Sequence, residues 1–157
     1  MKILIFSDSH GLTRHMDAVF DKHDDVEQII FLGDCLDDWK NYAFKKPFIA
    51  VPGNCDFFYR GEKEAIVTIA DKKFWLTHGH NQGVKYDYDR ITDLAARRGV
   101  DVCCFGHTHV ATSFTKGGIL FLNPGSVSEP RGREGASYAI VEVVNGVVLA
   151  KIMFLGA

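Results

Sequence analysis

The sequence predicts a single α/β domain in which two β-sheets pack together with helices on the outside. In the front half, apolar strand-like runs alternate with amphipathic helical segments. Beyond residue 110 no helical period is visible, and apolar runs recur between turn signals. At 157 residues the chain has the length of one ordinary domain, and no linker or internal repeat interrupts it. We therefore expect residues 1–157 to form one domain.

The front half is expected to begin with a βαβαβ unit. Its strands are the runs at residues 3–6, 28–32 and 47–52, which are rich in apolar residues and break at Gly, Ser or Pro. Apolar residues at helical spacing predict an amphipathic helix over residues 12–20, and a shorter helical stretch is expected near residues 37–46. Because helical crossovers join parallel strands, these three strands should be parallel.

The rest of the chain is expected to be richer in strands. Residues 65–69 and 73–77 have the pattern of a hairpin, and a helix from Tyr88 should end at Gly99 before a strand at residues 101–105. Farther on, a Gly-Gly and an Asn-Gly pair are strong hairpin turns. They lie among four further expected strands, at residues 110–116, 119–122, 137–144 and 147–154.

Composition and charge exclude several classes of partner. Hydrophobic residues make up 46% of the chain and charged residues 24%, and a net charge of −2 leaves no basic excess for binding an extended nucleic acid. No apolar run reaches membrane-spanning length, and the first is too short for a signal peptide. The four cysteines lack CxxC spacing, so we expect neither disulfides nor a structural zinc site. A cytoplasmic protein without a membrane partner is expected.

Five of the apolar runs end in side chains that bind metal ions. Open α/β sheets bind ligands at the carboxyl edge of their strands, so these side chains should converge there. Two carboxylates, one amide and four imidazoles suit a site for two metal ions, and they are Asp8, His10, Asp34, Asn54, His78, His107 and His109. Two other histidines, His15 and His23, lie among charged residues and are expected to be solvated.

The spacing of these side chains indicates how they share two ions. Asp8 and His10 lie two residues apart, where an extended segment points both side chains the same way, so the pair suits one ion. His107 and His109 have the same spacing but serve either one ion or two, because the chain leaves its strand there. Asp34 offers two oxygens and is the natural bridge between metals about 3.5–4 Å apart. A hydroxide between such ions is nucleophilic at neutral pH, so no serine or cysteine nucleophile is required.

The chain carries five motifs in the order SDSHG, GD, GNCD, THGH and GHTH. They resemble those of the calcineurin-like metallophosphoesterase superfamily, and the later NPGSVSEPR is similar to its small bacterial and archaeal phosphodiesterase branch. The resemblance implies a four-layer-like sandwich of two mixed β-sheets flanked by helices. It implies two divalent transition-metal ions, with Mn²⁺ as the first expectation and Fe, Zn²⁺ or Ni²⁺ as alternatives. One ion would be bound by Asp8, His10, Asp34 and His109, and the other by Asp34, Asn54, His78 and His107.

One position departs from the family pattern. Many members carry a His after the Gly-Asn pair, placed to stabilise the transition state or to protonate the leaving oxygen, whereas this chain has Cys55. A neutral thiol is a poor substitute, and a positioned general acid contributes roughly 10² to 10⁴-fold. We therefore expect a preference for acidic leaving groups. The residues expected to act in catalysis are Asp34, Asn54 and His10.

Five residues are candidates for substrate contact, most with a plainer alternative. His80 either touches substrate or orders its neighbours, and Phe57 either lines the substrate entrance or packs under a loop. Cys55 and Ser126 lie in loops that the resemblance places near the metals, although Ser126 also suits a purely structural turn. Arg131 either clamps a phosphate or is solvated.

The leading interpretation is a metal-dependent phosphodiesterase that hydrolyses small phosphodiesters by attack of a metal-bridging hydroxide at a dinuclear site. A phosphomonoesterase is the nearest alternative, but a dianionic monoester benefits from extra cationic clamps, and no arginine lies within the five motifs. A non-catalytic metal-binding scaffold of the same fold is a further alternative, because fold alone does not define function. A homo-oligomer is compatible with the sequence.

Overall fold

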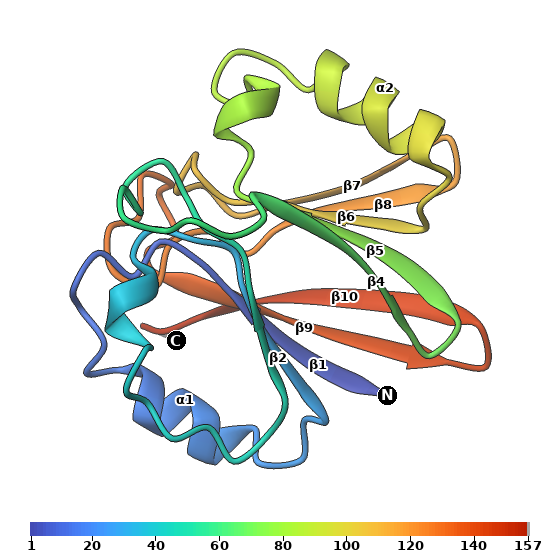
Figure 1. Cartoon of the computed structure of the whole chain (residues 1–157). Coiled ribbons are helices and arrows are strands. Elements are labelled where there is room, and N and C mark those ends of the chain that lie inside the picture. The colour runs from blue at the N-terminus through green and yellow to red at the C-terminus, as the bar shows by residue number, and fades with distance from the viewer. Residues whose placement is uncertain (157) are drawn as a thin grey trace.

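The computed structural model describes residues 1–156, so residue 157 of the expected domain lies outside the described residues. Two five-stranded sheets face each other in this structure (Figure 1). The first has the order β10-β9-β1-β2-β3 and consists of β1 (Lys2–Phe6), β2 (Gln28–Phe31), β3 (Phe48–Ala50), β9 (Ser137–Val144) and β10 (Val147–Phe154). The second has the order β4-β5-β6-β8-β7 and consists of β4 (Glu64–Ile69), β5 (Lys72–Thr77), β6 (Val102–Cys104), β7 (Thr112–Lys116) and β8 (Ile119–Asn123).

Both sheets mix parallel and antiparallel pairs. In the first sheet, β1 pairs with β2 and β2 with β3 in parallel, as the βαβαβ pattern predicts, and β9 is antiparallel to β1 and β10. In the second sheet, β5, β6 and β8 are parallel, and β4 and β7 are the antiparallel edges. The predicted pair of mixed sheets is therefore confirmed.

Buried apolar side chains hold four layers together. Ile5 and Leu76 belong to the core between the two sheets. The outer face of the first sheet is covered by α1 (Met16–Lys22), which buries Met16 and Val19. The outer face of the second is covered by α2 (Asp89–Arg98), which buries Ile91. Each large apolar side chain so buried contributes about 1.5–3 kcal/mol. No helix among residues 1–156 is long and apolar enough to cross a membrane.

The prediction of a helical stretch near residues 37–46 is wrong. This segment contains only the end of a 3-10 helix, η1 (Leu36–Asp38), and then runs irregularly to β3. Its aromatic residues pack on α1 instead: the ring centroids of Tyr42 and Phe44 lie 5.4 and 5.6 Å from that of Phe20. Packing against α1 thus decides the path of this segment, not local helix propensity.

The expectation that His23 is solvated is also wrong. The residue follows α1, is only 7% exposed, and places its Nε2 2.7 Å from the hydroxyl of Tyr138 on β9. The partner is 115 positions away, so no local pattern indicates it. His15 is exposed, as expected, and α1 begins only at Met16, later than the predicted residues 12–20.

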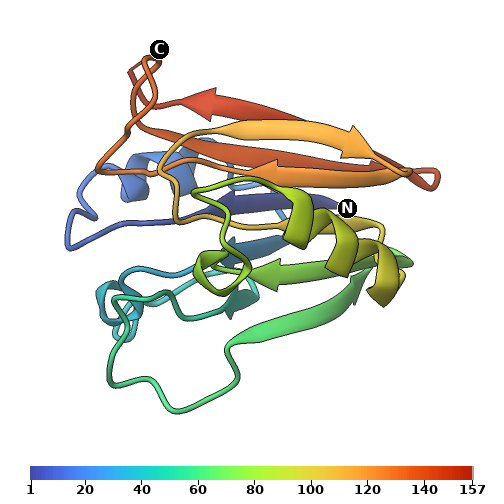
Figure 2. The same ribbon diagram turned by 90° about the horizontal axis from the view of Figure 1, so that it is seen from above.

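The five strands that carry the predicted ligands belong to both sheets. β1, β2 and β3 lie in the first sheet, whereas β5 and β6 lie in the second. Their carboxyl ends and the loops that follow gather at one edge of the sandwich, as two perpendicular views show (Figures 1 and 2). Six of the seven predicted ligands therefore meet where two sheets adjoin, and not at the edge of one open sheet: Asp8, His10, Asp34, His78, His107 and His109.

Candidate metal centre

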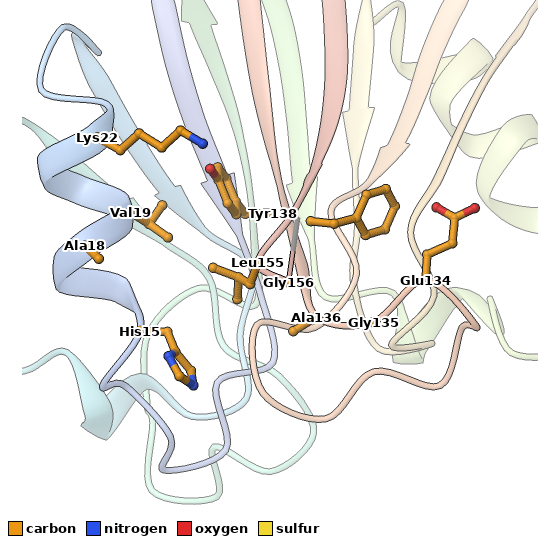
Figure 3. A pocket seen from close by; sticks show the side chains of 11 residues that line it. His15, Ala18, Val19, Lys22, Glu134, Gly135, Ala136, Tyr138, Leu155 and Gly156 are labelled. Carbon is orange, nitrogen blue, oxygen red and sulfur yellow. The ribbon is translucent and has the colours of Figure 1, made fainter.

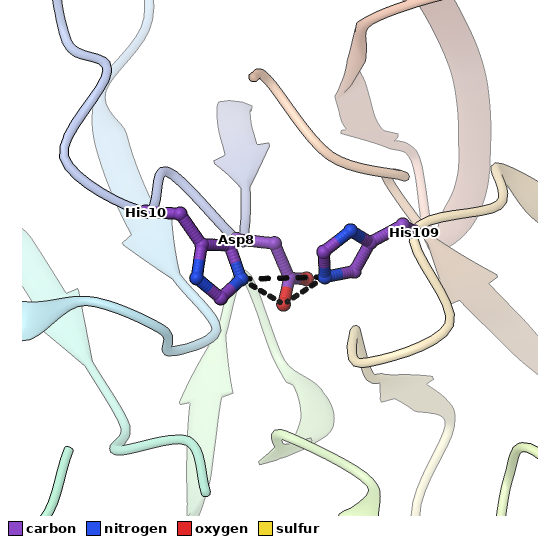
Figure 4. A group of neighbouring side chains, drawn as sticks. All are labelled: Asp8, His10 and His109. Carbon is purple, nitrogen blue, oxygen red and sulfur yellow. Dashed lines mark hydrogen bonds and ion pairs between the residues drawn. The ribbon is translucent and has the colours of Figure 1, made fainter. Parts of the chain in front are cut away.

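Asp8, His10 and His109 form one group of potential metal ligands (Figure 4). One donor atom of each lies within 4.8 Å of the others. Nε2 of His109 lies 3.3 Å from Oδ1 of Asp8, Nε2 of His10 lies 3.7 Å from the same oxygen, and the two Nε2 atoms are 3.3 Å apart. The loop after β1 and the loop after β6 thus bring together residues a hundred positions apart in the chain.

Asp34, His78 and His107 form a second group, in which one donor atom of each residue again lies within 4.8 Å of the others. Oδ2 of Asp34 lies 3.3 Å from Nε2 of His78 and 3.6 Å from Nε2 of His10, which belongs to the first group. Nε2 of His78 also lies 3.7 Å from Oδ1 of Asp8. The two groups are therefore contiguous, and Asp34 lies between them.

Two buried polar atoms of the centre have no hydrogen-bond partner among the described residues: Oδ1 of Asp8 and Nε2 of His78. A buried polar atom without a partner costs about 1–3 kcal/mol. The other oxygen of Asp8 is held by the Ser7 hydroxyl at 2.7 Å and by the backbone N–H of His107 at 3.2 Å. The free oxygen and the free nitrogen are donors of the kind that a divalent transition metal binds, so the residues fit such an ion.

Backbone carbonyls select the tautomer of two of the histidines. Nδ1 of His78 lies 2.7 Å from the carbonyl oxygen of Leu32, and Nδ1 of His109 lies 2.7 Å from that of Glu129. Because a carbonyl only accepts, Nδ1 carries the hydrogen in both rings. In the neutral ring each Nε2 then presents its lone pair to the centre, which is the arrangement of metal-binding histidines.

Most of the predicted ligands have a strained backbone. A positive φ is uncommon for residues other than glycine, and such residues cluster at functional sites. Five of the seven predicted ligands have a φ between 44° and 72°: Asp8, His10, Asp34, His107 and His109. The loops after β1, β2 and β6 are therefore shaped for the position of these side chains at a cost in local backbone energy.

Charge and burial set the protonation of the centre. Burial by itself would raise the pKa of Asp8, but the neighbouring imidazoles of His10, His109 and His78 and the Ser7 hydroxyl outweigh it and hold this pKa below its ordinary value. Burial and the neighbouring His78 lower the pKa of His107 to about 4. At neutral pH the Asp8 carboxylate is charged and the His107 imidazole neutral, as metal ligation requires.

Three supporting residues were not predicted. Ser7 holds one oxygen of Asp8. Asp56 accepts hydrogen bonds from the backbone N–H groups of Asp34, Leu36 and Gly53 at 2.7–3.0 Å. These bonds link the loop after β2 to the loop after β3. Gly53 packs so closely that an added Cβ would lie 2.7 Å from Cγ of Asp34. Ser7 lies within the SDSHG motif, and Gly53 and Asp56 lie within GNCD, so their positions in these motifs could have indicated a role at the centre.

Asn54 and Cys55, which follow the third strand, are more exposed than the residues of the two ligand groups. Asn54 is exposed, and its amide nitrogen lies 3.7 Å from the sulfur of Cys55. The backbone N–H of Cys55 donates to Oδ1 of Asp34 at 2.8 Å. Partial loss of hydration around the sulfur and the charge of Asp34 raise the pKa of the Cys55 thiol to about 11. The thiol is thus neutral at physiological pH and in contact with the centre.

The candidates for substrate contact lie in different surroundings. The ring centroid of His80 lies 5.5 Å from that of His78, and its buried Nδ1 has no hydrogen-bond partner among the described residues. Ser126 is fully buried, and its hydroxyl donates to the carbonyl of Asp8 at 2.8 Å, so it supports the Asp8 loop and does not face solvent. Arg131 is exposed, and its backbone N–H donates to the carbonyl of His109.

A hollow of about 330 Å³ adjoins the centre at Cys55. Phe57 is 74% exposed and Phe58 89% exposed, so the burial considered for Phe57 does not occur. The hollow is lined by Cys35, Leu36, Asp37, Cys55, Asp56, Phe57, Phe58 and Tyr59. A larger hollow of about 490 Å³ lies between α1 and the end of β10 (Figure 3), and none of the predicted site residues lines it.

The fold and the paired carboxylate–histidine groups together define a metallophosphoesterase. A model of the calcineurin-like phosphoesterase superfamily domain matches residues 1–146, and the chain belongs to that superfamily. The probable metallophosphoesterase YsnB of Bacillus subtilis is 38% identical over 146 residues, which cover 92% of this chain and 86% of YsnB. The phosphodiesterase YfcE of Escherichia coli is 29% identical over 168 residues, covering 90% of this chain and 88% of YfcE. A predicted phosphoesterase from Streptococcus pneumoniae has a similar solved structure, with a TM-score of 0.82, 28% identity and coverage of 99% and 90%.

Proposed function

We propose that this metallophosphoesterase is a phosphodiesterase that hydrolyses small phosphodiesters at a dinuclear metal site. The observation that supports it best is the contiguity of the two ligand groups through Asp34, with unpartnered donor atoms on Asp8 and His78. When bound, two ions would supply a bridging hydroxide as the nucleophile and stabilise the charge that develops on phosphorus. The relative YfcE bears the name phosphodiesterase, which favours the same reaction.

In this proposal the ligands divide as the resemblance implied. Asp8, His10 and His109 would hold one ion, His78, His107 and Asn54 would hold the other, and Asp34 would serve both. Asp34, Asn54 and His10 act as the catalytic residues in this proposal. Buried Asp34 would orient both ions, and the more exposed His10 and Asn54 would meet the substrate.

Charge favours a diester over a monoester. Two divalent cations, the carboxylates of Asp8 and Asp34, and a hydroxide leave a net charge of about +1. This charge matches a monoanionic phosphodiester, whereas a dianionic monoester requires further cations. Arg131 is a candidate for such a clamp, because its backbone N–H donates to the carbonyl of His109, but its exposed side chain has no partner that would hold it toward the centre among the described residues.

We further propose that the hollow beside Cys55 accepts one ester substituent of the substrate. Phe57 and Phe58 offer exposed aromatic faces there, and an apolar or aromatic leaving group would cover them. His80, beside His78 and His107, contacts the phosphoryl oxygens in this arrangement. Phe57→Ala should raise KM for an aromatic diester more than it lowers kcat, and an unchanged KM would contradict this assignment.

The remaining features of the proposal concern the setting of the enzyme. We take residues 1–157 to be one calcineurin-like domain, because β10 continues the first sheet beyond the matched residues 1–146. We take Mn²⁺ as the activating ion, with Fe, Zn²⁺ and Ni²⁺ as alternatives that mixed nitrogen and oxygen ligation also suits. Four free cysteines suit the reducing cytoplasm. The enzyme acts on small substrates, and assembly with further copies is compatible with this function.

The test compares hydrolysis of bis-p-nitrophenyl phosphate with that of p-nitrophenyl phosphate, using metal-stripped protein reloaded with Mn²⁺. We expect faster turnover of the diester, no turnover without metal, and loss of turnover in Asp34→Asn. Asp24→Asn, which changes an exposed carboxylate, is the matched control and should retain activity. Faster turnover of the monoester would favour a phosphomonoesterase. Two bound ions without turnover of either ester would favour a scaffold.

A further inference from the structure

Cys55 belongs to a third group of potential metal ligands. One donor atom each of His10, Asp34 and Cys55 lies within 4.8 Å of the others. The group shares His10 with the first ligand group and Asp34 with the second, but its sulfur belongs to neither. The departure from the family pattern at Cys55 thus adds a donor of different chemistry to the centre.

The third group opens toward solvent. Cys55 is exposed, the side chain of His10 is 20% exposed, and Asp34 lies buried beneath them. The N–H of Cys55 binds Oδ1 of Asp34, which leaves Oδ2 on the side of His10. An ion held by the three donors would therefore lie on the exposed side of the bridging carboxylate.

The donor set discriminates among metals. Thiolate sulfur and imidazole nitrogen bind Zn²⁺ and the softer Cd²⁺ well, whereas Mn²⁺ prefers oxygen. We propose that His10, Asp34 and Cys55 form a thiophilic metal position that takes Zn²⁺ or Cd²⁺ but not Mn²⁺. It is an alternative to the position of the first ion, because Nε2 of His10 faces both Asp8 and Asp34 and binds one ion at a time. Binding breaks the S–H bond, forms a sulfur–metal bond and releases the proton to solvent, with no change in oxidation state.

The position has a consequence for catalysis. Cys55 lines the hollow in which we place an ester substituent, so an ion bound to its sulfur would obstruct substrate. Excess Zn²⁺ should inhibit the Mn²⁺-loaded enzyme, and inhibition should weaken in Cys55→Ser. This consequence rests on the proposed function, whereas the metal position itself does not.

The direct test is a Cd²⁺ titration of metal-stripped, fully reduced protein, followed by the ultraviolet sulfur-to-cadmium charge-transfer band. We expect the band in the wild type, its loss in Cys55→Ser and its retention in Cys35→Ser. Cys35 is the matched control because it lines the same hollow but is not part of the group. A band that persists in Cys55→Ser, or that never forms in the wild type, would overturn the inference.

A second route avoids dependence on one variant. Alkylation of folded Cys35→Ser protein with iodoacetamide at alkaline pH, where Cys55 ionises, should modify Cys55, because Cys103 and Cys104 are fully buried in β6, and the band should then disappear. Hydrolysis of bis-p-nitrophenyl phosphate with Mn²⁺ is measured in parallel. A band without turnover would contradict only the proposed function, and turnover without a band would contradict only the thiophilic metal position.

Discussion

The hydroxyl of Ser7 donates a hydrogen bond of 2.7 Å to Oδ2 of Asp8, and this contact leaves Oδ1 as the oxygen that faces the histidines. Both residues are fully buried, so water does not compete for the contact. A side chain that orients a metal ligand typically accounts for about 10–100-fold in metal affinity. Ser7 therefore acts on the centre through Asp8, without itself being a ligand.

Ser7→Ala should weaken Mn²⁺ binding by about 10–100-fold, because Asp8 loses the partner that orients it. Isothermal titration of metal-stripped protein measures the change directly. Ser113→Ala, an exposed change on β7, is the control and should bind as the wild type does. Equal affinities for Ser7→Ala and the wild type would show that the His107 N–H alone orients the carboxylate.

Gly53→Ala should displace the Asp34 carboxylate, because Gly53 packs against it. The added Cβ would lie 2.7 Å from Cγ of Asp34, so either the carboxylate or the third strand's loop must shift. Overpacking of this kind costs about 1–3 kcal/mol, and displacement of Asp34 should also reduce the number of bound ions. Urea unfolding and metal analysis check the two effects. Gly132→Ala, whose nearest contact would be 3.7 Å, should change neither.

Cys55→His should accelerate substrates with poor leaving groups selectively. An imidazolium at this position can protonate an alkoxide, and a general acid contributes roughly 10² to 10⁴-fold, whereas a nitrophenolate needs little help. The measurement is kcat/KM for an alkyl and a nitrophenyl diester in both proteins. A uniform change, or a loss on both substrates, would count against the assignment of a missing acid at Cys55.

Removal of metal should destabilise the fold, because the buried donors of Asp8 and His78 then lack a partner. Ligand at about 100 times its Kd stabilises a native state by about 2.7 kcal/mol. Thermal unfolding with Mn²⁺ and with a chelator measures the difference. Asp8→Asn should reduce the metal-dependent part of the shift, and a variant shift as large as that of the wild type would contradict the assignment.

His23 should make stability depend on pH. Burial lowers its pKa below the ordinary 6.5, so the folded state binds fewer protons than the unfolded state. Its contribution is therefore present above about pH 6.5 and is lost as pH falls through the folded-state pKa. In metal-free protein, the difference in unfolding free energy between wild type and His23→Asn should shrink from about pH 7 to about pH 5. The exposed His15→Asn is the control, and a His23 difference that grows on acidification would refute the prediction.

Much of the centre could be predicted because its signals are local. A buried strand that ends in a polar residue is recognisable from a few neighbouring letters, and the first sheet's parallel strands follow from their crossovers. The same reasoning failed for residues 37–46 and for His23, where Phe20 and Tyr138 supply the deciding contacts. Those partners lie in other elements, so their effect depends on packing and not on propensity.

The sequence by itself determined the strands, the order of the motifs and the residues able to bind metal, since apolar runs, turn residues and donor atoms are properties of short segments. Tertiary structure alone decided that the ligands come from two facing sheets and that Asp34 lies between two groups. It also placed the sulfur of Cys55 beside His10 and Asp34. These relationships join strands far apart in the chain, and they arise only when burial of both sheets' inner faces brings the strand ends together.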